Sequence, residues 1–135
     1  MSDSVQTRLK QIRDALLALH KALIDAERVS YEQAIGRIKS PNHFLELLMH
    51  DPWFAWLQPM SQLIVAMDEA LEEKDAPLSD SAVEGMANQT RLLLRVSEEG
   101  EGASKQYFDA LQGDPGVVLA HAEVAKLLKP PSKKS

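Results

Sequence analysis

The strongest constraint on the fold is a long stretch without proline near the start of the chain, residues 4 to 35. Apolar side chains recur along it at alternating spacings of four and three residues: Val5, Leu9, Ile12, Leu16, Leu19 and Leu23. This spacing places them on one side of an α-helix, which turns once in about 3.6 residues. We predict a first helix of about 32 residues, roughly 48 Å long, that Gly36 ends. A helix of this length is typical of a helical bundle.

Three later helix starts share one pattern, in which Ser or Asp directly precedes Pro41, Pro52 or Pro115. The Ser or Asp oxygen accepts a hydrogen bond from a backbone N–H of the first turn that has no partner within the helix. Proline suits the first helical position, because the N–H that it lacks would have no partner there. The pattern predicts helices from residue 41 to about 50, from 52 to about 73 and from 115 to about 128. Pro59 would lie two turns into the second of these, so we expect a bend there.

Two further helices follow from turn and capping residues. Ser79 is the predicted N-cap of one, whose inner face would carry Val83, Met86, Ala87, Thr90, Leu93, Leu94 and Ser97. A short helix over residues 104–113 would be closed by Gly113. No alternating strand pattern is visible. We predict an all-α fold, an antiparallel bundle of four main helices with two additional short helices, forming a single domain over residues 1–128 with a flexible basic tail over 129–135.

Composition excludes several classes of function. The 135 residues include no cysteine, which rules out disulfides, cysteine nucleophiles and zinc–thiolate sites and is compatible with a reducing cytoplasm. The start of the chain shows no apolar leader, and no apolar run is long enough to span a membrane, so we expect a cytoplasmic protein without a membrane partner. The net charge of −5 argues against nucleic-acid binding. No phosphate-binding loop or nucleophile elbow is present, so we expect no cofactor and lean against an enzyme.

An aromatic cluster lies in "HDPWFAWLQP", residues 50–59. In a helix that begins at Pro52, Trp53, Trp56 and Leu57 would share one face and Phe54 would lie on its flank. One interpretation is that the tryptophans seal one end of the bundle. The other is a partner-binding or ligand-binding patch at Trp53 and Trp56, because tryptophan is favoured at binding hot spots. The spacing does not decide between them.

Polar residues occupy positions where the helical pattern asks for apolar ones: His20 and Glu27 in the first helix and His121 in the last. With Tyr31 they are candidates to line an internal ligand-binding pocket, since local rules often break at functional sites. The alternative is a hydrogen-bonded core network of histidine and glutamate. His20 and Glu27 lie about 10 Å apart along the helix axis, too far to hold one metal ion together.

A second constellation, His43, Glu46 and His50, shares one face of the predicted helix 41–50. Glu46 with either histidine is spaced to chelate a metal ion weakly. The alternative is a solvated polar face.

The segments "ALLALHKALIDAERVSYE", residues 15–32, and "HDPWFAWLQPMSQLIVAMDEAL", residues 50–71, resemble a family of small bacterial helical-bundle proteins of unassigned function. The resemblance covers the first half of the chain. It implies a bacterial source and carries over no catalytic residue.

Two functions follow as expectations. The first is a non-catalytic helical scaffold or protein-interaction module that binds a protein partner or associates with itself, because catalytic motifs are missing and the first helix has a seam of apolar residues. The second is a bundle that binds a small-molecule ligand or a metal at an internal polar site formed by His20, Glu27 and His121.

Overall fold

The structure is a computed structural model that describes residues 2–73, 78–95 and 103–128. These residues form six α-helices and one 3₁₀ segment and contain no strand, so the predicted all-α class is confirmed. The elements are α1 Ser2–Ala34, α2 Pro41–His50, η1 Pro52–Leu57, α3 Gln58–Glu72, α4 Asp80–Leu93, α5 Ala103–Gly113 and α6 Pro115–Leu128. The predicted tail and Ser97 lie outside the described residues. Within those residues, no helix is both long and apolar enough to cross a membrane.

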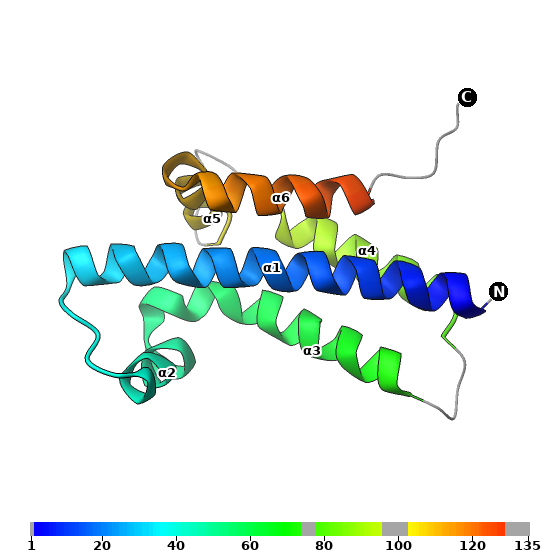
Figure 1. The fold of residues 1–135 in the computed structure, drawn as a ribbon, viewed down its shortest axis with the longest axis horizontal. Helices are drawn as coiled ribbons and strands as arrows, with labels where there is room; N and C mark the ends of the chain where they lie inside the picture. Colours follow the sequence, from blue (N-terminus) through cyan, green and yellow to red (C-terminus); the bar gives the residue numbers. More distant parts are fainter. Residues whose placement is uncertain (1, 74–77, 96–102, 129–135) are drawn as a thin grey trace.

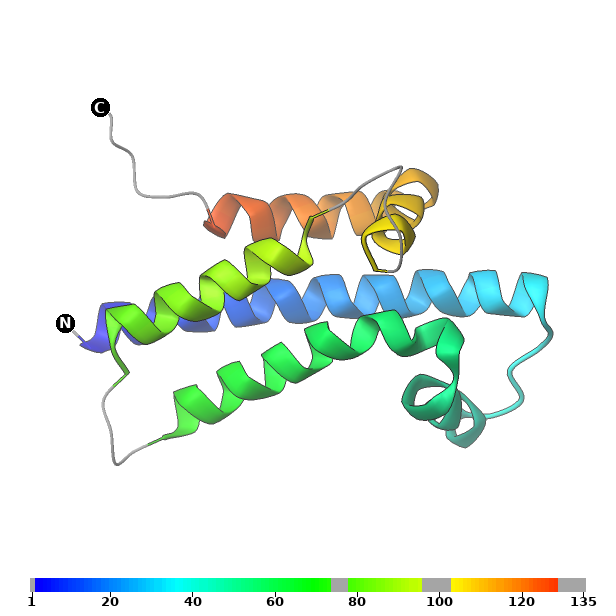
Figure 2. The ribbon, with the colours of Figure 1, turned by 180° about the vertical axis from the view of Figure 1, so that it is seen from behind.

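The long first helix organises the molecule. α1 runs through the middle, with α6 along one side and α3 along the other, and both run opposite to it (Figure 1). Seen from behind, α4 lies across α1 between these two helices (Figure 2). The five predicted seam residues from Leu9 onward are fully buried: Leu9, Ile12, Leu16, Leu19 and Leu23. Their spacing therefore predicted the face of α1 that the other helices cover.

The predicted helix starts are confirmed by their capping bonds. The Ser40 hydroxyl accepts from the His43 N–H at 3.0 Å, and the Ser79 hydroxyl accepts from the Ala82 N–H at 3.0 Å. The Asp114 carboxylate accepts from the Gly116 N–H at 2.8 Å. Each bond satisfies a first-turn donor that has no partner inside its helix.

The segment after Pro52 differs from its prediction. A single helix with a bend at Pro59 is wrong, because residues 52–57 form a 3₁₀ helix and α3 begins at Gln58. Pro59 thus lies in the first turn of α3, where its missing N–H leaves no backbone bond unmade. Asp51 is still the predicted cap, since its carboxylate accepts from the Trp53 N–H at 2.8 Å.

The 3₁₀ geometry also changes which aromatic ring is inside. With about three residues per turn, Trp53 and Trp56 form one row and Phe54 and Leu57 form the next. Phe54 is 1% exposed and Leu57 is 3% exposed, whereas both tryptophans are only half-buried. The prediction that Phe54 lies on the flank is therefore wrong, because it assumed the 100° rotation of an α-helix.

Charged side chains join the helices at the end where α1 begins. Arg8 of α1 contacts Glu84 of α4 at 2.9 Å, and Arg91 of α4 contacts the same carboxylate at 3.3 Å. The hydrogen bonds from Arg8 and then Arg91 lower the pKa of Glu84. Arg91 also donates to the Leu128 carbonyl at 2.6 Å, which satisfies a free acceptor at the end of α6.

Candidate functional site

The aromatic residues gather where η1 meets α1, α2 and α5. The Tyr31 ring lies 5.6 Å from both Trp53 and Phe54, measured between ring centroids. On the α5 side, Trp56 lies 6.3 Å from Tyr107. Such edge and tilted contacts are the usual packing of aromatic rings in a core. The two tryptophans therefore pack against aromatic rings of α1 and α5 at this end of the molecule. Their use as a partner-binding patch stays a prediction.

Glu27 of α1 is a half-buried ionisable group at this end. Burial raises the pKa of its carboxyl, the nearby Trp53 indole lowers it in part, and the charge of Asp109 raises it further. The indole N–H groups of Trp53 and Trp56 are buried, and neither reaches full hydrogen-bond geometry with an acceptor in the described part of the chain. Buried donors of this kind usually have a partner, which is often water. The site therefore combines a half-buried carboxyl that interacts with the Trp53 indole and a buried Trp56 donor that has no partner among the described residues.

His20 does not point toward Glu27's aromatic neighbours but joins α1 to α3. Its Nε2 lies 2.6 Å from the Ser61 hydroxyl, and burial lowers the pKa of the imidazole. Ser61 is 41 residues away in the sequence, so the spacing of residues did not indicate this contact. A serine nucleophile needs a histidine base at about this distance and also an accessible hydroxyl. The hollow beside this pair is lined by His20 but not by Ser61, so the serine hydroxyl does not open onto it. The bond therefore serves to join α1 to α3.

His121 is held by α5. Its Nδ1 lies 2.6 Å from the Tyr107 hydroxyl, and the two rings meet edge to face with centroids 5.5 Å apart. Burial lowers the pKa of His121 and raises that of Tyr107, which is 1% exposed. Neutral imidazole and neutral phenol are therefore the forms that this contact favours.

The four residues proposed for an internal pocket are thus divided among different partners. Trp53 brings Glu27 and Tyr31 together, whereas His20 binds Ser61 and His121 binds Tyr107. Sequence reasoning assigned no role to Tyr107 or Ser61. Their apolar-face spacing was a usable signal, but only packing could show that each would meet a histidine.

The second constellation lies on α2, none of whose side chains is fully buried. The His50 Nε2 and a Glu46 oxygen are 4.0 Å apart, the spacing of a loose ion pair. The His43 Nδ1 accepts from the Lys39 N–H at 3.0 Å, so the neutral ring carries its proton on Nε2 and has no free lone pair for a metal ion. Nowhere in the described ranges do three or more His, Asp or Glu side chains converge as a metal site.

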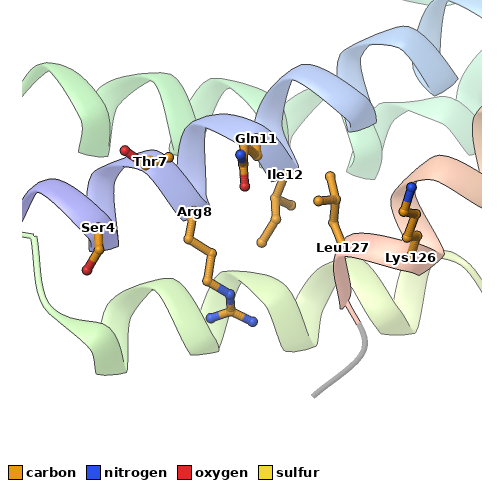
Figure 3. A pocket seen from close by; sticks show the side chains of 7 residues that line it. All are labelled: Ser4, Thr7, Arg8, Gln11, Ile12, Lys126 and Leu127. Atoms are coloured by element: carbon orange, nitrogen blue, oxygen red, sulfur yellow. The ribbon is translucent and has the colours of Figure 1, made fainter. Parts of the chain in front are cut away.

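A hollow that the sequence did not predict lies between the start of α1 and the end of α6. Its volume is about 670 Å³, and it is open to solvent. Arg8, Gln11 and Ile12 of α1 and Lys126 and Leu127 of α6 are among its lining residues, and Figure 3 shows Ile12 and Leu127 on its two sides with Arg8 pointing away from α6. The exposed polar positions of α1 were readable from the sequence, but the approach of α6 was not.

Comparison of the chain with protein-family models, with curated proteins and with solved structures finds no match to any of them. The resemblance to small bacterial helical-bundle proteins therefore stays a prediction.

Proposed function

We propose that this protein is a non-catalytic protein-interaction module built as an antiparallel bundle of four main helices with two short ones. The absence of cysteine and the bacterial resemblance support a role in a bacterial cytoplasm. A structural role of the histidines supports this proposal, because one ring nitrogen of His20 and one of His121 each form a hydrogen bond that joins two helices.

The observation that carries the proposal is the composition of α6. Apart from His121, Glu123 and Lys126, every residue of this helix is apolar or glycine. A surface helix normally has one apolar side and one polar side. A helix that is apolar on both sides is expected to be covered on both.

The solvent side of α6 is the proposed binding surface. Val117 and Val124 are fully buried against the bundle, whereas Val118 is 44% exposed and Leu119 is 70% exposed. Val118 and Leu119 with Pro115 and Ala122 form one exposed strip on this helix, because they lie within about two turns on the side away from Val117. An amphipathic helix of a partner protein would cover such a strip with its own apolar side.

Photo-cross-linking tests this surface. A benzoylphenylalanine at position 119 should give one discrete adduct in an extract of the source cells, and excess unlabelled protein should compete it away. The same group at exposed Gln106 of α5 is the matched control. The identified partner, once purified, should bind the Leu119→Arg variant at least about tenfold more weakly. Equal adducts at both positions, or equal affinity for the variant, would contradict the proposal.

A second candidate function is the binding of a small ligand at Glu27, Tyr31, Trp53 and Trp56. The buried Trp56 indole donor favours it, because a ligand with a hydrogen-bond acceptor would satisfy that donor. Titration with anilinonaphthalene sulfonate, read by energy transfer from tryptophan, tests access to this site. We expect Trp56→Phe to reduce the transfer if the probe binds there, and no transfer at all would remove this candidate.

A further inference from the structure

The side of α1 opposite its buried leucines faces solvent between α3 and α6 (Figure 1). Leu17, which is 47% exposed, and Ala18 lie near the middle of this side. Four exposed charged residues share it, because a helix rotates by about 100° per residue: Lys10, Asp14, Lys21 and Asp25. We call these six residues the outer face of α1.

Hollows lie along both flanks of this face. A hollow of about 470 Å³ is lined by Asp14, Leu17, Ala18, His20, Lys21 and Ile24. A second, of about 420 Å³, shares Asp14 and Ala18 with the first and is walled by α6. The second also shares Gln11 and Leu127 with the hollow of Figure 3. The hollows therefore lie next to one another along α1, and Asp14 and Ala18 lie at the boundary between the first two.

The charge pattern of the outer face is complementary to the same pattern on a second, antiparallel copy. Positions 14 and 21, and positions 10 and 25, are each symmetric about the point between Leu17 and Ala18. Each symmetric pair joins a lysine to an aspartate. Two copies of α1 laid antiparallel about that point would set Asp14 against Lys21 of the second copy and Lys10 against Asp25 of the second copy.

We infer that the outer face of α1 binds a second copy of this chain, with the two α1 helices antiparallel and related by a twofold axis that passes between Leu17 and Ala18. A parallel pair in register would place each lysine against the same lysine and each aspartate against the same aspartate, so charge disfavours it. The surface is separate from the exposed strip of α6, and the inference goes beyond the proposed function.

Three of the four charged side chains form exposed contacts within α1 that can exchange for contacts with a partner. Asp14 contacts Arg13 at 2.9 Å, and the Asp14 side chain is 57% exposed. Lys21 contacts Asp25 at 3.2 Å within one helix, and their side chains are 79% and 58% exposed. Exposed pairs of this kind contribute little to a monomer, so exchanging them for contacts across the axis costs little. The outer face runs from residue 10 to residue 25, about 24 Å along the helix axis. A strip about 10 Å wide on each copy gives roughly 500 Å² in total, below the size of stable specific interfaces. The dimer should therefore form reversibly and depend on protein concentration and on salt.

Sedimentation equilibrium over a range of protein concentrations tests the charge pattern. Lys21→Asp should raise the dimer dissociation constant about tenfold or more, because the twofold axis makes each substitution act twice. Asp14→Lys should act in the same way. The double variant Asp14→Lys with Lys21→Asp exchanges the charges and should restore an affinity close to that of the natural chain.

Lys105→Asp is the matched control. Lys105 contacts Asp109 at 2.9 Å with the same four-residue spacing, but it lies on α5 and outside the outer face. It should leave the dissociation constant unchanged.

Cysteine cross-linking tests the position of the axis, since the natural chain has no cysteine. Ala18→Cys places two thiols beside the axis and should give a disulfide-linked dimer on mild oxidation, faster than Ala82→Cys at an exposed position of α4. A monomer at every concentration, equal cross-linking at positions 18 and 82, or a double charge variant that stays as weak as the single ones would each overturn the inference. None of these results bears on cross-linking from position 119.

Discussion

Tyr107 and His121 join α5 to α6 through a contact of 2.6 Å between a buried hydroxyl and an imidazole nitrogen. Tyr107→Phe removes the hydroxyl and leaves that nitrogen without its partner. We expect the free energy of unfolding to fall by about 1 to 2 kcal/mol, measured by urea denaturation. Tyr31→Phe is the control, because the Tyr31 ring packs on Trp53 and Phe54 and its hydroxyl takes part in no hydrogen bond of the described structure. An equal loss in both variants would show that the Tyr107–His121 hydrogen bond makes no particular contribution to the free energy of unfolding.

Adjacent leucines in α1 give a second test at this scale. Leu16 is completely buried and Leu17 is 47% exposed. Leu16→Ala should lower the free energy of unfolding by about 2 to 5 kcal/mol, because it removes buried methyl groups and leaves a cavity. Leu17→Ala should change it by less than about 0.5 kcal/mol when measured at a protein concentration too low for association. Similar losses at the two positions would mean that α1 is rotated from the face described.

At the scale of whole helices, two serine caps have the same chemistry in different settings. Ser40 caps α2, which has no fully buried residue, and Ser79 caps α4, which buries Val83, Ala87 and Thr90. Ser79→Ala should lower the global free energy of unfolding by about 1 kcal/mol.

Ser40→Ala should act locally instead. Because α2 contributes less to the buried core, we expect faster hydrogen exchange of its amides with a smaller change in global unfolding. Hydrogen exchange followed by mass spectrometry, together with urea denaturation, separates the two effects. A larger global loss for Ser40→Ala than for Ser79→Ala would contradict this view of α2.

For the whole molecule, the buried ionisable groups predict how stability depends on pH. Burial lowers the pKa of His20 and His121 below the ordinary value of 6.5, so the unfolded chain takes up protons first as the pH falls. Stability should therefore fall as the pH drops below 6.5 and level off below the pKa values of the two histidines in the folded state.

Glu27 acts in the opposite direction. Its raised pKa means that the unfolded carboxyl loses its proton first, so stability is lost as the pH rises above 4.5.

Urea denaturation from about pH 8 to about pH 5 measures this dependence. The double variant His20→Gln with His121→Gln should flatten the decline below 6.5, and Glu27→Gln should remove the opposing trend. A steeper decline in the histidine variant would show that these imidazoles are charged in the folded protein.

The sequence alone determined the helices and where most of them begin. The seam from Leu9 to Leu23 and the caps at Ser40, Ser79 and Asp114 are local features, because a helical face repeats every three or four residues and a capping bond spans two or three. The segment after Pro52 was beyond this reasoning. Whether six residues wind as 3₁₀ or α depends on how Phe54 and Leu57 fit the core and on the proline that follows.

Only the tertiary structure decided which polar groups meet. His20 finds Ser61 across 41 residues, and Tyr107 finds His121 across 14, at separations where sequence spacing carries no geometric information. The same holds for the hollows between α1 and α6, since their walls come from both ends of the chain. Neighbouring residues determine the short-range geometry of the backbone, whereas the contacts between helices follow from how their apolar faces pack together.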